Sequence, residues 1–90
     1  MKVYIVHEYW WLDCTDGTNI LGVFSKVESA MKVLNDWTVR RTEEVEEESG
    51  EAAITRSIAS DVENCVYECQ VMDSEETCEY KVWIEEWEVQ

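Results

Sequence analysis

The chain has 90 residues, 46% of them hydrophobic, and a formal net charge of -14. This length suits a single domain, and five Trp with four Tyr supply enough apolar surface for a core, which excludes extensive disorder. Seven bases against 21 acids argue against direct binding of nucleic acid. No apolar run is long enough to span a membrane and the N-terminus lacks a signal-peptide pattern, so we expect a cytoplasmic protein.

Residues 2–12 are rich in β-branched and aromatic side chains on both alternating faces, which predicts a central strand. Residues 13–18 contain an Asp-Gly pair and predict a turn. Residues 19–24 then return as a second strand. The N-terminal segment is therefore expected to form an antiparallel hairpin.

Ser25 and Glu28 match the S-x-x-E capping box, so we expect a helix that begins at Lys26. The apolar residues that follow recur at helical spacing and form one stripe, which predicts a helix packed on the sheet. They are Val27, Ala30, Met31, Leu34 and Trp37.

Residues 38–60 form a variable acidic segment whose conformation the sequence leaves open between helix and loop. Its glutamate run contains one core-forming residue, Val45, and ends at Ser49-Gly50, a plausible stop. The four-residue spacing of three later apolar residues allows a short second helix. They are Ile54, Ile58 and Val62.

Residues 65–73 and 78–89 flank the polar sequence SEET, which predicts a second hairpin. Its apolar residues coincide on one face if Val71 pairs with Cys78, and the register then continues through three further pairs. These pairs are Cys69 with Tyr80, Tyr67 with Val82, and Cys65 with Ile84. A bulge or an early strand end is expected after Ile84, where two glutamates interrupt the alternation.

The predicted fold over residues 1–90 is a single α+β domain. It has a small antiparallel sheet in the order β-β-α, then a short helix or loop, then β-β. The one main helix packs on one face of the sheet.

Four cysteines without an export signal are expected to be reduced thiols. On a strand, the C-x3-C spacing of Cys65 and Cys69 separates the two side chains by about 13 Å. This separation is too large for a shared tetrahedral zinc site, so no metal or cofactor is predicted. The thiols are Cys14, Cys65, Cys69 and Cys78.

Catalysis is not predicted. The one histidine, His7, lies in the first predicted strand and has no nucleophile at a recognisable turn beside it. Adjacent acids such as Glu85 and Glu86 would point to opposite faces of a strand, so they would not act as an acid/base pair. We therefore expect no enzyme.

The acidic excess is confined to the second half of the chain. Residues 1–42 hold five acids and five bases, whereas residues 43–90 hold sixteen acids and two bases. Duplex DNA carries one charge per ~1.7 Å, so fourteen charges correspond to about 24 Å of duplex. If these acids converge in space, they would attract a basic surface that normally holds phosphates, although acidity can also serve solubility alone.

Two groups of residues are the candidates for binding such a surface. The first would steer the approach of the partner, and the second would supply docked contacts in which tryptophan adds contact area. The first group is Glu43, Glu44, Glu46, Glu47 and Glu48, and the second is Glu79, Glu85, Glu86 and Glu88 with Trp83 or Trp87.

The segments KVYIVHEYW and ILGVFSKVESAMKVL resemble a family of small phage and bacterial proteins. Its members open with a VY-type strand, followed by a GVFS-x-x-E-x-A junction from strand to helix. The match covers residues 2–37, and the resemblance implies a β-β-α start and a phage or bacterial context. In general character the chain is also similar to acidic anti-CRISPR and other anti-defence proteins.

We therefore expect a small phage-type inhibitor that acts in the host cytoplasm. It would bind a host protein or nucleoprotein with a basic surface, such as a CRISPR effector, by resembling nucleic acid. The alternative is a structural or regulatory module that forms a homo-dimer or larger homo-oligomer through an exposed sheet edge and its tryptophans.

Overall fold

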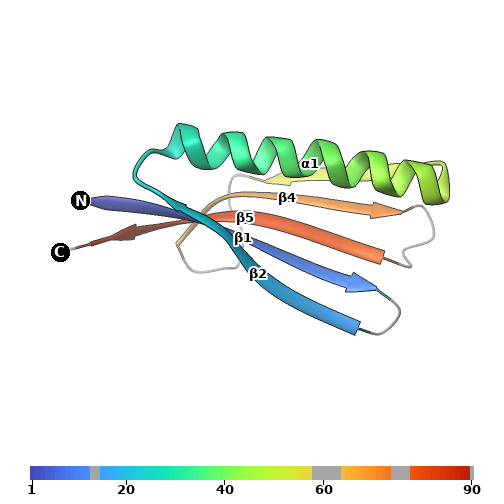
Figure 1. Ribbon diagram of the computed structural model, residues 1–90, viewed down its shortest axis with the longest axis horizontal. Helices are drawn as coiled ribbons and strands as arrows, with labels where there is room; N and C mark the ends of the chain where they lie inside the picture. Colours follow the sequence, from blue (N-terminus) through green and yellow to red (C-terminus); the bar gives the residue numbers. More distant parts are fainter. Residues whose placement is uncertain (13–14, 58–63, 74–77, 90) are drawn as a thin grey trace.

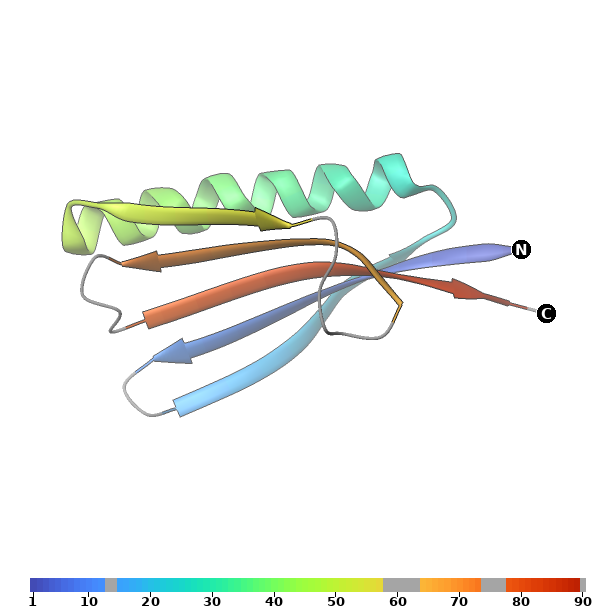
Figure 2. The ribbon, with the colours of Figure 1, turned by 180° about the vertical axis from the view of Figure 1, so that it is seen from behind.

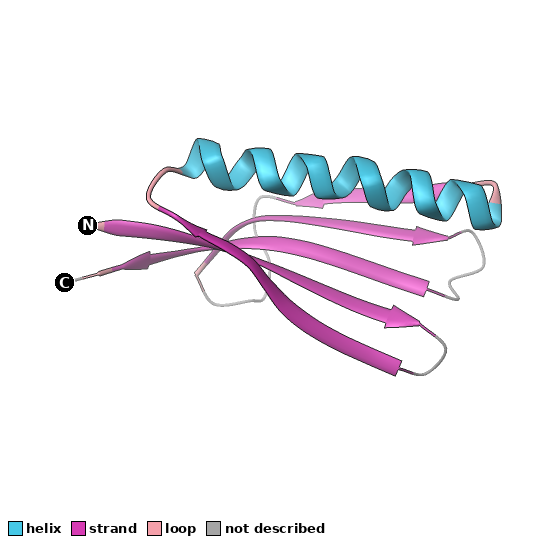
Figure 3. Ribbon diagram, in the orientation of Figure 1, coloured by secondary structure: helices cyan, strands magenta, loops and turns pink. Residues whose placement is uncertain are grey.

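The computed structural model describes residues 1–12, 15–57, 64–73 and 78–89. Two strands are followed by one helix and three further strands (Figure 3). The elements are β1 (Lys2–Leu12), β2 (Thr15–Phe24), α1 (Val27–Ser49), β3 (Ala52–Ser57), β4 (Cys65–Asp73) and β5 (Cys78–Glu88).

The strands form one antiparallel sheet in the order β2-β1-β5-β4-β3. The helix α1 lies along one side of this sheet, and the twisted layers form an elongated molecule of 45 × 23 × 20 Å (Figure 1). The predicted α+β class and the packing of one helix on an antiparallel sheet are confirmed. The predicted element order is wrong, because the sheet has five strands rather than four.

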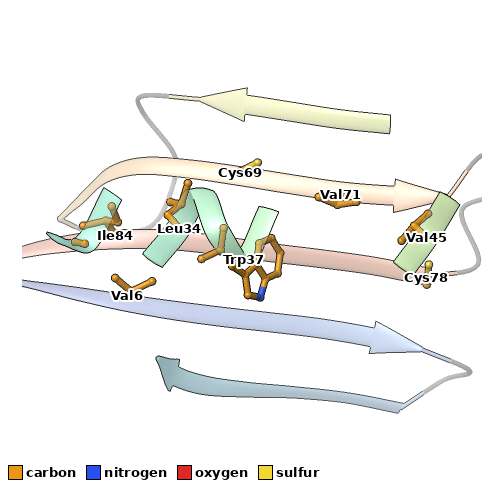
Figure 4. Packing of buried hydrophobic residues seen from close by; sticks show 10 residues of the cluster. Val6, Leu34, Trp37, Val45, Cys69, Val71, Cys78 and Ile84 are labelled. Atoms are coloured by element: carbon orange, nitrogen blue, oxygen red, sulfur yellow. The ribbon is translucent and has the colours of Figure 1, made fainter. Parts of the chain in front are cut away.

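The core lies between α1 and one face of the sheet. Side chains of α1 such as Leu34 and Trp37 point toward alternate residues of the central strands, which are fully buried (Figure 4). The alternation of a strand sends the residues between them to the other side of the sheet, hereafter the open face. Within the described part of the chain no helix covers the open face. The core residues are Val6, Ala30, Leu34, Trp37, Val45, Cys69, Val71, Cys78, Val82 and Ile84.

The helix continues through the glutamate run and has 23 residues. Its apolar stripe is confirmed at Ala30, Leu34 and Trp37, and Val45 extends it by two further turns. The helix ends where the Ser-Gly sequence suggested, since Gly50 adopts a left-handed conformation with φ 81° and donates its N–H to the carbonyl of Glu46. Among the described residues no helix is long and apolar enough to cross a membrane.

The predicted capping box is wrong. The N-cap is Lys26, and no side chain caps the helix there. Ser25 lies one residue too early, so its hydroxyl does not reach the first free N–H groups of α1. The helix begins one residue later than expected.

The predicted short second helix is also wrong, because Ala52–Ser57 forms the edge strand β3. Ile54 pairs with Val71 of β4, and Ala52 pairs with Asp73. A four-residue apolar spacing fits a strand as well as a helix, since residues i and i+4 lie on one face of both. Ile58 and Val62 lie outside the described residues.

The first hairpin is longer than predicted. The strand β2 begins at Thr15, so Asp16 and Gly17 are strand residues rather than a turn. Gly17 pairs with Trp10, and a β-carbon at Gly17 would lie 2.5 Å from Cζ2 of the indole. The glycine therefore admits a tryptophan ring over the neighbouring strand. Residues 13 and 14 lie outside the described residues.

The second hairpin has the predicted apolar face but not the predicted register. Val71 pairs with Tyr80 instead of Cys78, which is a slip of two residues that keeps Val71, Cys69 and Tyr67 on their expected face, whereas Cys65 pairs with Glu85. The carboxylate of Asp73 accepts a hydrogen bond from the N–H of Cys78 at 3.2 Å across the connection. The irregularity near Ile84 lies on β4, between Cys65 and Tyr67, whereas β5 continues without interruption to Glu88.

Candidate functional site

The five steering candidates lie together on the last two turns of α1. We refer to Glu43, Glu44, Glu46, Glu47 and Glu48 as the acidic helix segment. All five side chains are exposed. Among the described residues one base pairs with this group, since Arg41 donates to Glu44 at 2.9 Å. The structure therefore brings this predicted group together on one rigid element.

The position of the acidic helix segment is unfavourable for the helix itself. The C-terminal end of a helix carries partial negative charge, and the last turn of α1 contains no base. Residues three and four apart are neighbours on a helix, so pairs such as Glu43 with Glu47 place like charges side by side. This concentration of charge lowers the local stability of α1.

The docking candidates do not join the acidic helix segment. On β5, Glu79, Trp83, Glu85 and Trp87 alternate with core residues such as Val82 and Ile84, so they lie on the open face, opposite α1. We expected the acids of the second half to converge into one surface. The sheet separates Glu79 and Glu85 from the acidic helix segment, because the helix packs on the other face. Glu86 and Glu88 lie on the same face as α1 but at the far end of β5, beside Lys2 and the N-terminal amine.

Glu85 organises the aromatic residues of the open face. Its carboxylate accepts hydrogen bonds from the indole N–H groups of Trp83 at 2.7 Å and Trp87 at 2.9 Å. The imidazole of His7 stacks on Trp83 with ring centroids 5.1 Å apart. Its Nε2 lies 3.0 Å from the carboxylate of Glu85 without the alignment of a hydrogen bond. Glu85 is therefore occupied within the molecule, and its side chain is 14% exposed.

The remaining acids of β5 have partners of their own. Glu86 forms an ion pair with Lys2 at 3.0 Å, which raises the pKa of the lysine. Glu88 lies 3.0 Å from the N-terminal amine. Glu79 accepts a hydrogen bond from Gln70 at 2.9 Å and lies 3.6 Å from Lys81. Exposed pairs of this kind can exchange partners at little cost in free energy.

The open face also contains a shallow pocket of about 410 Å³. Its lining combines two aromatic rings with two acids and one base from three neighbouring strands. Three lining residues, Tyr9, Glu68 and Lys81, were missed by sequence reasoning. Alternation along β5 could have placed Lys81 beside Glu79 and Trp83, but no local pattern signals Tyr9 and Glu68, because they reach the pocket only through the strand order in which β5 lies between β1 and β4. The lining residues are Tyr9, Glu68, Glu79, Lys81 and Trp83.

A second polar group lies between α1 and the sheet, around the buried carboxylate of Glu8. It accepts hydrogen bonds from Trp37 at 2.8 Å and Asn19 at 3.1 Å, and Arg41 lies 3.5 Å away. The guanidinium of Arg41 also packs 4.7 Å from the ring centre of Tyr80. A cavity of about 200 Å³ adjoins this group. The carboxylate satisfies the polar groups that α1 presents to the sheet, which is a structural role.

The cysteines of the described residues behave as small hydrophobic side chains. Cys69 and Cys78 are buried, and Cys65 is partly buried. Burial, reinforced by the negative charge of Asp73, raises the pKa of the Cys78 thiol. Among the described residues no group of His, Cys, Asp or Glu is placed to hold a metal ion. Cys14 lies outside the described residues.

The family model that matches the chain covers residues 1–90 and is described as a domain of unknown function, DUF7336. No curated protein and no solved structure matches the chain. Three features thus lie within the matched region: the acidic helix segment, the open-face pocket, and the group of Glu85 with His7, Trp83 and Trp87, hereafter the Glu85 cluster. The chain is a member of the DUF7336 family.

Proposed function

We propose that the protein is a non-catalytic binding protein that attaches to a basic surface through its acidic helix segment. The observation that carries this proposal is the gathering of five exposed carboxylates within six residues of one rigid helix, where the described residues form one ion pair with them. An array that lowers the stability of its own helix favours a role beyond solubility.

The spacing of these charges supports resemblance to nucleic acid. Six helical residues span about 9 Å at a rise of 1.5 Å per residue. Five carboxylates over this length give about one charge per 1.8 Å, which is close to the ~1.7 Å per charge of duplex DNA. A basic channel shaped for phosphates would therefore attract the acidic helix segment.

The class of partner follows from the same charge and from the sequence resemblance. We propose a phage-type inhibitor that acts in the host bacterial cytoplasm on a nucleic-acid-binding complex of a defence system, such as a CRISPR effector. Of the docking candidates on β5, Glu85 is not available to a partner, because its carboxylate already accepts hydrogen bonds from Trp83 and Trp87. The helix would supply the main attachment.

The test is a comparison of two immobilised proteins in bacterial lysate at low and high salt. One is the native chain, and the other carries Glu→Gln at all five positions of the acidic helix segment. A nucleic-acid-binding partner should be retained by the native chain at low salt, be released at high salt, and be lost with the variant. Purified nucleic acid should compete with the native chain for this partner. Equal retention of the partner by both proteins would contradict the proposal.

A second candidate function, self-association, is favoured by the exposed edge of β2. Among the described strands this ten-residue edge strand has no neighbour on its outer side, and Asp16 is its one charged residue. Within this strand Ile20 and Val23 are 62% and 58% exposed. Unprotected edges of this kind pair with other strands.

Light scattering distinguishes the two functions. A dimer at micromolar concentration that becomes monomeric in Ile20→Lys would favour a homo-oligomeric module. A native monomer would leave the binding function as the better account. The variant Val39→Lys is the matched control, because Val39 is equally exposed but lies on α1.

A further inference from the structure

We propose that the pocket on the open face binds the guanidinium group of an arginine side chain. The inference rests on the proposed function in one respect, namely that the arginine would belong to the basic partner. It adds a specific contact on the side of the sheet opposite the acidic helix segment. The pocket is formed by Tyr9, Glu68, Glu79, Lys81 and Trp83.

The ring of Trp83 is fixed in position by contacts within the molecule. Its indole N–H donates to Glu85 at 2.7 Å, and His7 stacks on the ring at an interplanar angle of 5°. The side chain therefore has little rotational freedom left to lose on binding. The pocket lies beside this fixed ring, between β1 and β4. A planar cation can stack against such a ring, and Tyr9 offers a second one.

Glu68 supplies the charge that fits the cation. It pairs in the sheet directly with Trp83 and makes no hydrogen bond or ion pair within the described part of the chain. Glu79 also lines the pocket but shares its carboxylate with Gln70 and Lys81. An arriving guanidinium can therefore pair with Glu68 without breaking an existing contact, and can take Glu79 from Lys81.

The composition of the pocket selects against the other ligands that bind aromatic sheet faces. Two carboxylates repel a phosphate, so a stacked nucleotide is disfavoured in a chain of charge -14. A second copy of the chain that docked through this same face would place its own pocket carboxylates against these two, and the like charges would repel. Arginine fits better than lysine, because its planar group both stacks and forms two parallel hydrogen bonds with a carboxylate.

The probe is the amide of Nα-acetyl-arginine, titrated into the 15N-labelled full chain and followed through the tryptophan indole N–H signals. We expect a saturable shift of the Trp83 signal, assigned with Trp83→Phe, and no shift of the buried Trp37. The matched control ligand is the amide of Nα-acetyl-citrulline, which has the same shape without the charge. Citrulline should leave the Trp83 signal in place.

Two variants separate a built site from general attraction to an acidic protein. Glu68→Gln should weaken binding by roughly threefold, the size expected for one exposed ion pair. Lys81→Gln should strengthen it by a similar factor, because it removes the competing base from the pocket. Glu86→Gln is the control, because Glu86 lies on the face of β5 opposite the pocket and forms an ion pair with Lys2.

An absent Trp83 shift, or equal shifts with arginine and citrulline, would overturn the pocket proposal. Equal effects of Glu68→Gln and Glu86→Gln would overturn it as well. The probe uses neither the partner nor the acidic helix segment, so this proposal can fail while the proposed function stands. Conversely, arginine could still bind the five-Gln variant while the native chain captures no partner from lysate. That result would support the pocket proposal and contradict the proposed function.

Discussion

Glu8 is the residue that ties α1 to the sheet through polar contacts. Its carboxylate is nearly buried and accepts hydrogen bonds from Trp37 and Asn19. In Glu8→Ala these donors and Arg41 lose their shared acceptor, so we expect the free energy of unfolding to fall by about 2–3 kcal/mol. Urea denaturation followed by tryptophan fluorescence measures the loss. Glu28→Ala, on the exposed start of α1, is the control, and a loss of equal size there would contradict this role.

Glu85 plays the corresponding role on the open face. In Glu85→Ala the two indole N–H groups lose their acceptor, so we expect a loss of about 1–2 kcal/mol in the free energy of unfolding. The near-ultraviolet circular dichroism of the tryptophans should also change, because Trp83 and Trp87 are no longer fixed. Glu86→Ala should leave both measurements nearly unchanged. Identical results for the two variants would show that Glu85 does not organise the open face.

Stability should fall at alkaline pH because of Cys78 and Tyr80. Burial is the main cause that raises the pKa of both groups above their ordinary values. The folded chain therefore holds these two protons more tightly than the unfolded chain does. The stabilisation is fully present below the ordinary thiol pKa of about 8.5 and is lost as the pH rises further. Urea midpoints at pH 7.5 and pH 10 should differ, and Tyr80→Phe should reduce the difference. A midpoint independent of pH in this range would contradict the assignment.

At the scale of elements, the acidic helix segment should lower the stability of α1 while it strengthens binding of a basic partner. Neutralising Glu43 and Glu47 to Gln removes two like charges from the unfavourable end of the helix. We expect the free energy of unfolding to rise by up to about 1 kcal/mol at low salt, while binding of a basic partner weakens. Thermal denaturation and affinity are measured on the same variant. A decrease in stability would mean that these carboxylates support the helix instead.

The sequence predicted elements where periodicity and side-chain chemistry agreed. The strand at residues 2–12 and the helical stripe through Leu34 and Trp37 were predicted correctly. The strand β3 was missed because a four-residue spacing does not separate a strand from a helix. The slip of two residues in the last hairpin was missed because alternation determines the face of each side chain and not its partner.

The predicted site failed in part for a reason of topology. The acidic helix segment could be recognised from its composition alone. Its separation from Glu79 and Glu85 could not be predicted, because it depends on the glutamate run being helical and on the side of the sheet where that helix packs. Tyr9 and Glu68 meet Trp83 only through the order β1-β5-β4, which no local pattern encodes.

At the scale of the whole molecule, the sheet divides two kinds of surface. One side bears α1 with its row of carboxylates, and the other bears the aromatic residues that Glu85 holds in place. The two termini lie together at one end, where the N–H of Val89 donates to the carbonyl of Met1 at 2.7 Å (Figures 1 and 2). The acidic end of α1 lies toward the opposite end of the molecule, where Val45 packs near Val71 and Cys78 (Figure 4). A partner can thus approach the acidic helix segment without contact with the chain ends.

The salt dependence of affinity for the captured partner tests the central claim most directly. Dissociation constants are measured over a series of salt concentrations for the native chain and for two double variants of α1. Glu43→Gln with Glu47→Gln should weaken binding and flatten its dependence on salt. Glu28→Gln with Asp36→Asn removes the same charge from the other half of the same helix, and should keep most of the native affinity and slope. Equal weakening by both double variants, or a native affinity independent of salt, would contradict the role of the acidic helix segment.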